Sequence, residues 1–479
     1  MQPLRRSKHI YFMGIKGVAM TALAVICAER GYQITGSDVN EVFQTDEILA
    51  KIRLQPLLGF SADNIIQHRP DAVIFTGAHG GSANIEVKTA QSLGIPVYSQ
   101  AEALGMFMSG YRQLSVCGCH GKTTTTAMLA VILTTTGVPV SYSIGCGMVC
   151  GLGVPGHATN KNNLKQWFIA EADEYVTDVA AADHTPRFMW QKPEILLVTN
   201  VDWDHPDVYK NLTSVKSVFQ RFAETVPIAG KIIINADDPN SDLLKKYHHR
   251  ISVGLHKSAD FQIRAIIYTT GLTRFNLITP QDQIISLALH VPGRHNVQNA
   301  AMAAVAANLA GVDWSDIKRG LLLFCGTKRR FEFLRQVRGI DFYDDYAHHP
   351  AEIKATISGI RLWYPKRRII TVFQPHTYSR TISLLGDFAQ AFGQVTVPVI
   401  MEIYASARES DQHTISSKIL TDQLLRYNKY ACFAASDQAV VRILRQNTRK
   451  GDLVIFMGAG DIFRRGQEII NLYQSTYES

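Results

Sequence analysis

The sequence lacks any apolar run long enough to cross a membrane. No segment of its 479 residues approaches the ~18 consecutive apolar residues of a membrane-spanning helix. A basic group, Arg5, Arg6 and Lys8, precedes the apolar segment 18–28 and superficially resembles a signal peptide. A nucleotide-binding fold, developed below, explains the same residues better. We therefore expect a cytoplasmic protein with no membrane partner.

Long basic blocks are also missing. The net charge is +8, but no Lys/Arg block is longer than 328–330 or 366–368, and no basic stripe is interleaved with aromatic residues. Proteins that bind nucleic acid usually concentrate positive charge in such patches. A solvated surface is the simplest explanation of the excess charge, and an anionic small substrate is compatible with it. We expect no nucleic-acid partner.

The cysteines fit neither a secreted disulfide framework nor a zinc ribbon. There are seven of them in a long chain, far below the density of small disulfide-stapled domains. Cys117 and Cys119 form a C-x-C pair, and Cys146 and Cys150 a C-x-x-x-C pair, which is not the usual zinc spacing. We expect buried or loop thiols and no zinc.

What the sequence does contain is the composition of a globular protein with a large core. Hydrophobic residues make up 46% and charged residues 19%. The length suggests about three domains. Strand-like and helix-like segments alternate along most of the chain, which predicts an α/β fold. No short internal repeat and no low-complexity segment interrupts this pattern.

The segment 114–126 has the layout of a phosphate-binding loop. An apolar strand, 114–117, enters a glycine turn, and an amphipathic helix follows. Backbone N–H groups at such a helix start attract an anion, Lys122 can reach the outer phosphates, and Thr123 can ligate Mg²⁺. Val116 replaces the first glycine of the strict motif, so a plain turn with a surface lysine is the alternative. The predicted nucleotide contacts are Gly118, Cys119, His120, Gly121, Lys122, Thr123 and Thr124.

The first forty residues predict a Rossmann-like βαβ unit. A strand at 9–13 and a helix at 18–30 flank a glycine turn, and a second strand at 32–35 leads to Asp38. In such a unit the turn meets phosphate and the acid at the second strand's end meets ribose or base. A βαβ unit that binds nothing is the alternative. The candidate ligand contacts are Gly14, Ile15, Lys16, Gly17 and Asp38.

Acidic residues follow two more predicted strands. The strand 167–171 ends in Glu171, with Asp173 and Glu174 just beyond, and the strand 194–200 is followed by Asp202, Asp204 and His205. The carboxyl ends of parallel strands meet at one sheet edge. Because carboxylates and imidazole are metal ligands, Glu171 and His205 are expected to complete a metal site with Thr123. Exposed loop acids are the alternative.

The rest of the chain predicts a β-rich addition and a third α/β unit. Short alternating runs over 250–292 indicate a small antiparallel addition, and an Ala-rich helix follows Asn296, which we interpret as a cap or, less simply, a base-reading amide. Strands at 340–343, 368–373 and 452–456 each precede a polar turn. These turns indicate a second working sheet edge.

Taken together, the motifs resemble those of one enzyme family. They are Gly14-x-x-Gly17, Gly118-Cys-His-Gly-Lys-Thr-Thr-Thr125, Glu171-Ala-Asp-Glu174, Thr199-Asn200, Asp204-His205, His295-Asn296, Asn299-Ala300, Arg330-Phe-Glu332, Asp344-Asp-Tyr-Ala-His-His-Pro350, Phe373-Gln-Pro-His376 with Ser379-Arg380-Thr381, and Gly458-Ala-Gly-Asp461. The chain resembles, over essentially its whole length, the Mur ligase family of ATP-dependent amide-forming enzymes of peptidoglycan precursor synthesis. The motifs of the last third are similar to those of the alanine-adding branch.

The resemblance implies three domains and a two-step reaction. Residues 1–108 would bind the UDP-sugar, residues 109–327 would form the ATPase domain with a mixed or parallel sheet, and residues 328–479 would form a Rossmann-like amino-acid domain. The substrates would be UDP-N-acetylmuramate, L-alanine and ATP, with two Mg²⁺ ions. The sugar acid's carboxylate would take the γ-phosphoryl group, and the amine of alanine would then displace phosphate. A monomer or a dimer is expected.

The resemblance also assigns roles outside the first two motifs. Asn296 would meet the adenine, and Arg330 and Asp345 the nucleotide's phosphate or ribose. His348, His376 and Arg380 would bind the amino acid. The catalytic set would be Lys122, Glu171, His205, His348 and Arg380. Closure of the domains would exclude water from the acyl phosphate.

Several positions depart from the family's usual pattern. Lys16 stands where the first loop usually has glycine, Tyr175 follows Glu174 where serine is usual, and Thr377 replaces an arginine. The spacing from Glu171 to His205 is also longer than usual. These departures keep open a Mur-type ligase for another amino acid or another nucleotide-linked sugar acid. A non-catalytic nucleotide-binding switch is a further alternative, because the fold alone does not exclude it. Several related ligases carry a carbamylated lysine near the metal, but the resemblance does not assign that role to any lysine of this sequence.

Overall fold

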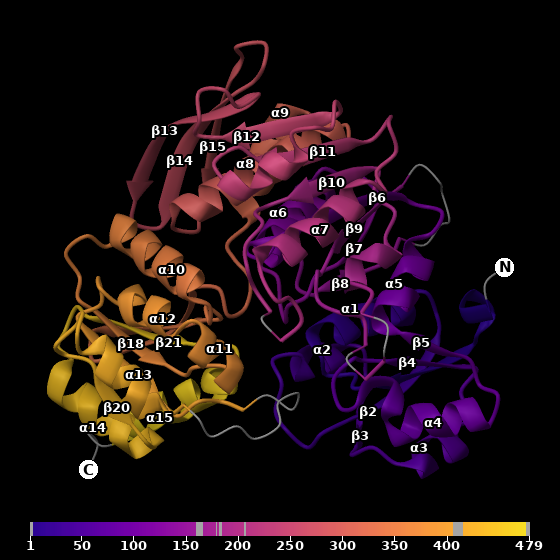
Figure 1. Ribbon diagram of the computed structural model, residues 1–479, viewed down its shortest axis with the longest axis horizontal. Helices are drawn as coiled ribbons and strands as arrows, with labels where there is room; N and C mark the ends of the chain where they lie inside the picture. Colours follow the sequence, from indigo (N-terminus) through magenta and orange to yellow (C-terminus); the bar gives the residue numbers. More distant parts are fainter. Residues whose placement is uncertain are drawn as a thin grey trace. The chain divides into compact units, whose positions relative to one another are not determined.

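The computed structural model describes residues 3–159, 166–178, 180–181, 184–205, 207–405 and 415–475. The chain forms two compact units. Unit 1 comprises residues 1–267, 274–289 and 296–327, and unit 2 comprises residues 268–273, 290–295 and 328–479. Unit 1 holds two β-sheets and unit 2 holds a third, all flanked by helices (Figure 1). The α/β fold class is therefore confirmed, while the domain boundaries expected at 108/109 and 327/328 stay predictions.

The N-terminal sheet is parallel throughout and has the strand order β3-β2-β1-β4-β5. Its central strands are buried, because helices cover the faces of a parallel sheet. The strands are β1 (His9–Met13), β2 (Gln33–Asp38), β3 (Leu57–Leu58), β4 (Ala72–Phe75) and β5 (Val97–Ser99). The helices are η1 (Pro3–Arg6), α1 (Val18–Glu29), α2 (Asp46–Lys51), α3 (Ala62–His68), η2 (Gly81–Ala83), α4 (Ile85–Ser92) and α5 (Gln100–Met108).

The second sheet of unit 1 has ten strands in the order β15-β14-β13-β12-β11-β10-β6-β9-β7-β8. The strands are β6 (Arg112–Cys117), β7 (Val140–Ser143), β8 (Gly156–His157), β9 (Trp167–Glu171), β10 (Ile195–Val198), β11 (Lys231–Asn235), β12 (Arg250–Gly254), β13 (Phe261–Thr269), β14 (Leu272–Ile278) and β15 (Ile284–Leu289). The helices are α6 (Lys122–Thr135), η3 (Arg187–Trp190), α7 (Leu212–Ala223), η4 (Pro239–Leu244), α8 (Arg294–Leu309) and α9 (Trp314–Leu323).

The β-rich addition differs from the prediction in part. We expected residues 250–292 to form a small antiparallel addition, and β13, β14 and β15 are sheet neighbours joined by connections too short for a parallel crossover. However, β12 pairs in parallel with both β11 and β13. These strands therefore extend the main sheet rather than forming a separate one. Alternation of apolar and polar residues indicates that one face of a strand is buried, but it does not indicate the direction of the neighbouring strand.

The sheet of unit 2 has the order β16-β17-β21-β18-β19-β20 and is parallel except for β16. The strands are β16 (Glu332–Val337), β17 (Ile340–Asp345), β18 (Ile369–Phe373), β19 (Val397–Met401), β20 (Cys432–Ala434) and β21 (Leu453–Met457). The helices are α10 (Pro350–Trp363), α11 (Tyr378–Ser383), α12 (Leu385–Ala391), α13 (Ser417–Leu424), α14 (Asp437–Asn447) and α15 (Ile462–Ser475). Among the described residues, none of the helices combines the length and the apolar character that crossing a bilayer requires.

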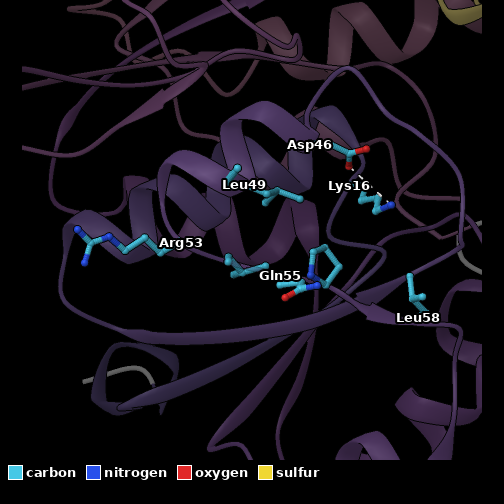
Figure 2. A pocket seen from close by; sticks show the side chains of 9 residues that line it. Lys16, Asp46, Leu49, Arg53, Gln55 and Leu58 are labelled. Carbon is cyan, nitrogen blue, oxygen red and sulfur yellow. Dashed lines mark ion pairs between the residues drawn. The ribbon is translucent and has the colours of Figure 1, made fainter.

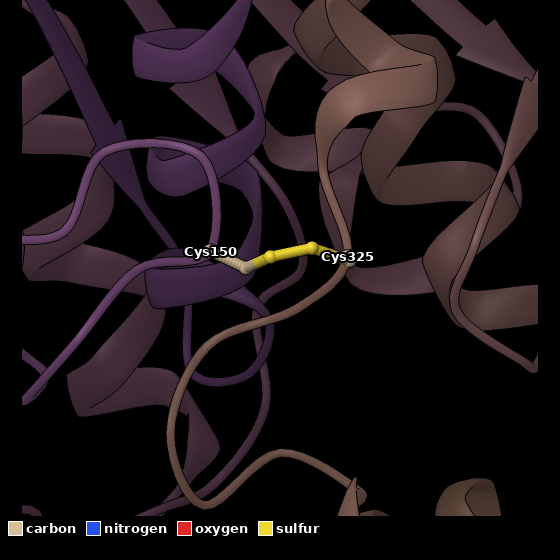
Figure 3. The surroundings of a disulfide bond; sticks show 2 residues. All are labelled: Cys150 and Cys325. Carbon is tan, nitrogen blue, oxygen red and sulfur yellow. A yellow bond between two sulfur atoms is a disulfide. The ribbon is translucent and has the colours of Figure 1, made fainter.

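A disulfide corrects one of the sequence-based expectations. Cys150, expected to be a thiol, forms a disulfide with Cys325, with a Cα–Cα distance of 5.5 Å (Figure 3). The bond joins a loop beyond β7 to the segment after α9, and the Cys150 N–H also donates to the carbonyl of Gly326 at 3.0 Å. The other cysteines are thiols, and the four in unit 1 are buried. A pairing across 175 positions has no local sequence signal.

Candidate active site

Strand pairing brings the phosphate-binding loop and both acidic segments to one sheet edge. β6 lies between β9 and β10, and all three run in parallel. Val116 pairs with Glu171, and Cys117 pairs with Val198. The turn that follows β6 is therefore flanked by the residues that follow the other two strands.

The end of β10 shapes the phosphate-binding loop. The His120 N–H donates to Oδ1 of Asn200 at 2.9 Å, and Nδ2 of Asn200 donates back to the His120 carbonyl at 2.8 Å. Gly118 and Gly121 have φ of 133° and 81°. A Cβ on Gly118 would overlap Oγ1 of Thr199, so glycine is required there by the close approach of β10 as well as by the backbone conformation.

Lys122, the first residue of α6, is folded back onto a buried carboxylate. Its Nζ donates to both oxygens of Glu174, at 2.8 and 3.1 Å, and to the Gly118 carbonyl at 2.7 Å. Burial disfavours the charge of the lysine, but Glu174 and Asp173 outweigh it and raise the pKa of Lys122. Lys122 is therefore a cation at neutral pH.

Thr123 and Glu171 supply adjacent oxygen atoms beside the lysine. The Thr123 hydroxyl donates to Oε2 of Glu171 at 3.2 Å, and the Gly145 N–H donates to Oε1 at 2.7 Å. Burial raises the pKa of Glu171, although the Gly145 hydrogen bond and Lys122 oppose this rise. A hydroxyl and a carboxylate in contact fit the hard-oxygen preference of Mg²⁺.

His205 lies beside Asp173 and Glu174, two acids that are not part of the metal site predicted from Thr123, Glu171 and His205. Its Nε2 lies 3.7 Å from Oε1 of Glu174, and ligand atoms of Asp173, Glu174 and His205 all lie within 4.8 Å of one another. Burial opposes ionisation of Asp173, but Arg187, at 2.8 Å, and then Lys122 and His205 lower its pKa to about 2. The structure thus pairs Glu171 with Thr123 and His205 with Glu174, while Lys122 links the two groups.

The start of α8 lies beside the phosphate loop. Asn296 is inside the first turn of α8, not at the position before it, so the cap interpretation is wrong. Nδ2 of Asn299 donates to Oδ1 of Asn296 at 3.4 Å, and Oδ1 of Asn299 lies 2.8 Å from where a Cβ on Gly121 would be. The structure therefore brings Asn296 towards the residues predicted to bind the nucleotide.

In the N-terminal sheet, the glycine turn is tied to Asp38. The Lys16 N–H donates to Oδ2 of Asp38 at 2.7 Å, and the Ile15 N–H donates to the Ser37 carbonyl at 3.1 Å. Asp38 is 1% exposed, and its burial raises its pKa against the opposing effect of its backbone hydrogen bonds. Gly14 has φ of 81° and packs against the side chain of Thr76.

The Lys16 side chain turns from the glycine loop toward the residues before and within α2. Its Nζ donates to the Glu41 carbonyl at 2.7 Å and lies 3.6 Å from Oδ1 of Asp46. Figure 2 shows this pair at a pocket of about 560 Å³ that Arg53 and Leu58 also line. Lys16 therefore connects the predicted phosphate contact to a neighbouring cavity.

Unit 2 gathers the three residues predicted to bind the amino acid. The rings of His348 and His376 lie 6.0 Å apart, and Nη1 of Arg380 lies 3.4 Å from Nδ1 of His376. The His376 ring stacks on Tyr404 at 5.7 Å. Thr377 is the N-cap residue immediately before α11, and its hydroxyl accepts a hydrogen bond from the Arg380 N–H at 3.4 Å.

Arg330 and Asp345 lie in the same unit but have different surroundings. Nη1 of Arg330 lies 3.6 Å from Oε1 of Glu352. The other carboxylate oxygen of Glu352, Oε2, lies 3.2 Å from Nδ1 of His348. Asp345 is 3% exposed and accepts hydrogen bonds from the backbone of Phe331 and Ala347, at 2.8 and 2.9 Å. In this structure Asp345 organises the loop around Arg330.

Comparison with known proteins identifies the family. Residues 9–112 match the Mur ligase family catalytic domain, residues 116–307 the Mur ligase middle domain, and residues 329–460 the Mur ligase glutamate ligase domain. A UDP-N-acetylmuramate–L-alanine ligase of Desulfitobacterium hafniense is 38% identical over 96% of this chain and 99% of its own. This chain belongs to the Mur ligase family. A second ligase with the same name, from Caldanaerobacter subterraneus, is 36% identical over 98% of each chain.

Solved structures agree with this Mur ligase in fold. The UDP-N-acetylmuramate–alanine ligase of Thermotoga maritima is 25% identical, with a TM-score of 0.80 over 98% of this chain and all of its own. A murein peptide ligase of Psychrobacter arcticus, 23% identical, has a TM-score of 0.71 over 98% of this chain and 99% of its own.

Two contacts of this Mur ligase were not predicted from its sequence. The sequence marks Glu174 only as one of several strand-end acids and does not predict its pairing with Lys122. The signal for it was present in the Glu171-Ala-Asp-Glu174 stretch. Tyr404 is far from His376 along the sequence, and nothing near either residue indicated that the two rings stack.

Proposed function

We propose that this Mur ligase uses ATP to join L-alanine to the carboxylate of UDP-N-acetylmuramate in peptidoglycan precursor synthesis, in the cytoplasm. Relatives 36–38% identical over almost the whole chain carry that activity in their names. The observation that carries the chemistry is Lys122, a buried cation at the start of α6 beside the Thr123–Glu171 pair. A cation and a helix N-terminus together favour a triphosphate.

The proposed first step is phosphoryl transfer at the phosphate-binding loop. The sugar acid's carboxylate attacks the γ-phosphorus of ATP, and ADP leaves with the bridging oxygen. Such a transfer depends mainly on positioning and charge neutralisation. Lys122 would stabilise the negative charge of the phosphates, and backbone N–H groups of the loop would orient them. Mg²⁺ held by Thr123 and Glu171 would add further charge neutralisation. A second Mg²⁺ ion would bind beside His205.

The proposed second step uses the side chains of unit 2. The amine of alanine attacks the acyl phosphate carbonyl, the amide bond forms, and phosphate leaves. Arg380 would bind the carboxylate of alanine, since a guanidinium fork matches a carboxylate. His348 and His376 would line the same site. Gly14, Gly17 and Asp38 would hold the UDP part, and Asn296 and Arg330 the nucleotide.

A second candidate is ligation of glycine or serine, or of another nucleotide-linked sugar acid. The observation that favours it is Thr377, which takes the place of an arginine and caps the start of α11 through the Arg380 N–H. A pocket with one cation fewer presents a different surface to the amino acid. Oligomeric state does not separate these candidates, and either a monomer or a dimer fits the proposal.

A coupled assay of ADP release tests the function. The proposal expects sustained ADP release over many turnovers only when ATP, UDP-N-acetylmuramate and L-alanine are all present. Release that is as fast with glycine or serine would support the second candidate. Slow ATP hydrolysis at a rate independent of UDP-N-acetylmuramate and of L-alanine would point to a nucleotide-binding switch and contradict the ligase.

A further inference from the structure

Asp178 docks the segment after Glu174 onto a turn of the N-terminal sheet. Oδ2 of Asp178 accepts a hydrogen bond from the Ser82 N–H at 3.2 Å. Its other oxygen accepts from the Ala180 N–H at 3.0 Å, and the residue is 6% exposed. A buried carboxylate that accepts backbone N–H groups forms charge-assisted hydrogen bonds, which are stronger than neutral ones.

The turn that receives Asp178 has an unusual backbone. His79, Gly80 and Gly81 have φ of 54°, 87° and 51°, so three successive residues are left-handed. A Cβ on Gly81 would overlap Oδ1 of Asp178, and a Cβ on Gly77 would lie 2.9 Å from the Thr177 carbonyl. The absence of side chains on the two glycines is what allows residues 177–178 to pack against residues 77–82.

The same turn contacts the proposed UDP-sugar site. Nε2 of His79 lies 3.8 Å from Oδ1 of Asp38, the acid at the end of β2. Thr76, at the start of the turn's loop, packs against Gly14 of the glycine turn. A shift of residues 77–82 would therefore move His79 relative to Asp38, next to Thr76 and its contact with Gly14.

The other end of the docked segment belongs to the ATP site. Asp178 is four residues beyond Glu174, and the ring of the intervening Tyr175 packs on His205 with centroids 4.8 Å apart. Arg187 holds the chain at two points, because it pairs with Asp173, just before Glu174, at 2.8 Å and donates to the Val176 carbonyl at 3.2 Å. The stretch from Glu174 to Asp178 thus has anchored ends.

We propose that Asp178 is a positioning residue that fixes the 77–82 turn, and with it His79 and Asp38, relative to Lys122 and Glu174. This inference rests on the proposed function, in which the first site binds the UDP-sugar and the second binds ATP. Asp178 touches no substrate in this account. Through the turn, it supports the residues proposed to bind the UDP-sugar.

Glycine substitutions provide a matched test. Gly81→Ala puts a methyl group where the Asp178 carboxylate lies, in a left-handed backbone. Gly94→Ala is the control, because Gly94 is also left-handed, with φ of 71°, and no described atom lies within 4 Å of its Cβ position. Both variants carry the same kind of backbone strain, and only Gly81→Ala displaces Asp178.

The readouts are the dissociation constant for UDP-N-acetylmuramate by calorimetry, the KM values of both nucleotides, and the thermal midpoint. We expect Gly81→Ala and Asp178→Ala to weaken UDP-sugar binding about tenfold, as loss of a charge-assisted hydrogen bond does, with the KM for ATP within about twofold. Gly94→Ala should leave the dissociation constant for UDP-N-acetylmuramate and the KM for ATP unchanged. Asp178→Asn, which keeps an acceptor oxygen for Ser82, should recover part of the affinity.

The double variant separates docking from general destabilisation. Because Gly81→Ala acts through Asp178, the Gly81→Ala/Asp178→Ala protein should bind UDP-sugar no more weakly than Asp178→Ala alone. The inference would be overturned if Gly81→Ala and Gly94→Ala weakened UDP-sugar binding equally. It would also be overturned if the affinity for UDP-sugar and the KM for ATP worsened together in proportion to the drop in the thermal midpoint. A wild-type protein that does not bind UDP-N-acetylmuramate would instead overturn the proposed function, and the inference with it.

Discussion

Nζ of Lys122 lies 2.8 Å from Oε2 of Glu174, a carboxylate with a side chain only 1% exposed. The lysine proposed to meet a triphosphate is therefore already paired inside the protein. A phosphate that arrives at the loop competes with Glu174 for the ammonium group. The pair keeps the lysine charged and directed into the site. Glu174 therefore influences the proposed phosphate site through Lys122, although Glu174 itself is not expected to touch ATP.

Replacing Lys122 with alanine tests the phosphate role. We expect Lys122→Ala to lower kcat by more than about tenfold, which corresponds to ~1.4 kcal/mol of lost transition-state stabilisation. The far-ultraviolet circular dichroism should be unchanged. Lys246→Ala, at a side chain 55% exposed, is the control and should keep its activity. Retention of more than a tenth of the wild-type kcat by Lys122→Ala would contradict the role.

Replacing Glu174 with glutamine tests whether the pair positions Lys122. The amide keeps the size and one acceptor but removes the charge that competes with phosphate. We expect kcat to fall about tenfold while the KM for ATP does not rise, because positioning is lost and competition is relieved. Steady-state kinetics with ATP varied measures both constants. A rise in KM with kcat unchanged would show that Glu174 takes part in nucleotide binding instead.

Replacing Arg380 with alanine tests the amino-acid site. Loss of a guanidinium–carboxylate contact should raise the KM for L-alanine about tenfold or more and leave the KM for ATP within about twofold. Arg319→Ala, at an exposed arginine of α9, is the control. If only the KM for ATP changed, the assignment of His348, His376 and Arg380 to the amino acid would be wrong.

Most of the sheet edge that forms the site was predictable from the sequence. The apolar runs at 9–13 and 167–171 became β1 and β9 with the expected bounds. Short buried runs between helical segments have few other structures available to them. Parallel strands also had to present their carboxyl ends together, which places Glu171 beside Thr123.

The direction of side chains beyond the strand ends was not predictable. Glu171 points to the Gly145 N–H and Thr123, whereas Glu174, three residues later, reaches Lys122 and His205. The chain leaves the regular alternation of a strand at that point, so tertiary contacts decide where each carboxylate points. The same holds for the Cys150–Cys325 bond, which depends on a contact between distant segments.

Asp71 allows a prediction about pH. Its Oδ2 accepts hydrogen bonds from the His9 and Lys8 N–H groups, at 3.0 and 2.7 Å, and these two bonds lower the pKa of Asp71. The folded protein therefore binds the Asp71 proton less readily than the unfolded chain, whose pKa is about 3.9. The stabilisation from Asp71 is present above that value and is lost as the pH falls through the lower folded-state pKa.

The measurement compares the thermal midpoints of wild type and Asp71→Asn across pH. We expect the wild type to unfold at the higher temperature near about pH 7 and the difference to shrink below about pH 4. Asp282→Asn, on another exposed turn, controls for the general effect of removing a charge. A difference between wild type and Asp71→Asn that stays constant over this range would contradict the pKa direction.

The fate of one oxygen atom tests the central claim most directly. UDP-N-acetylmuramate with ¹⁸O at both carboxylate oxygens is converted in the presence of ATP, Mg²⁺ and L-alanine, and the released phosphate is analysed by mass spectrometry. If the carboxylate attacks the γ-phosphorus and alanine then displaces phosphate, each phosphate carries one ¹⁸O atom. Phosphate that is formed together with the amide but contains no ¹⁸O would contradict the account.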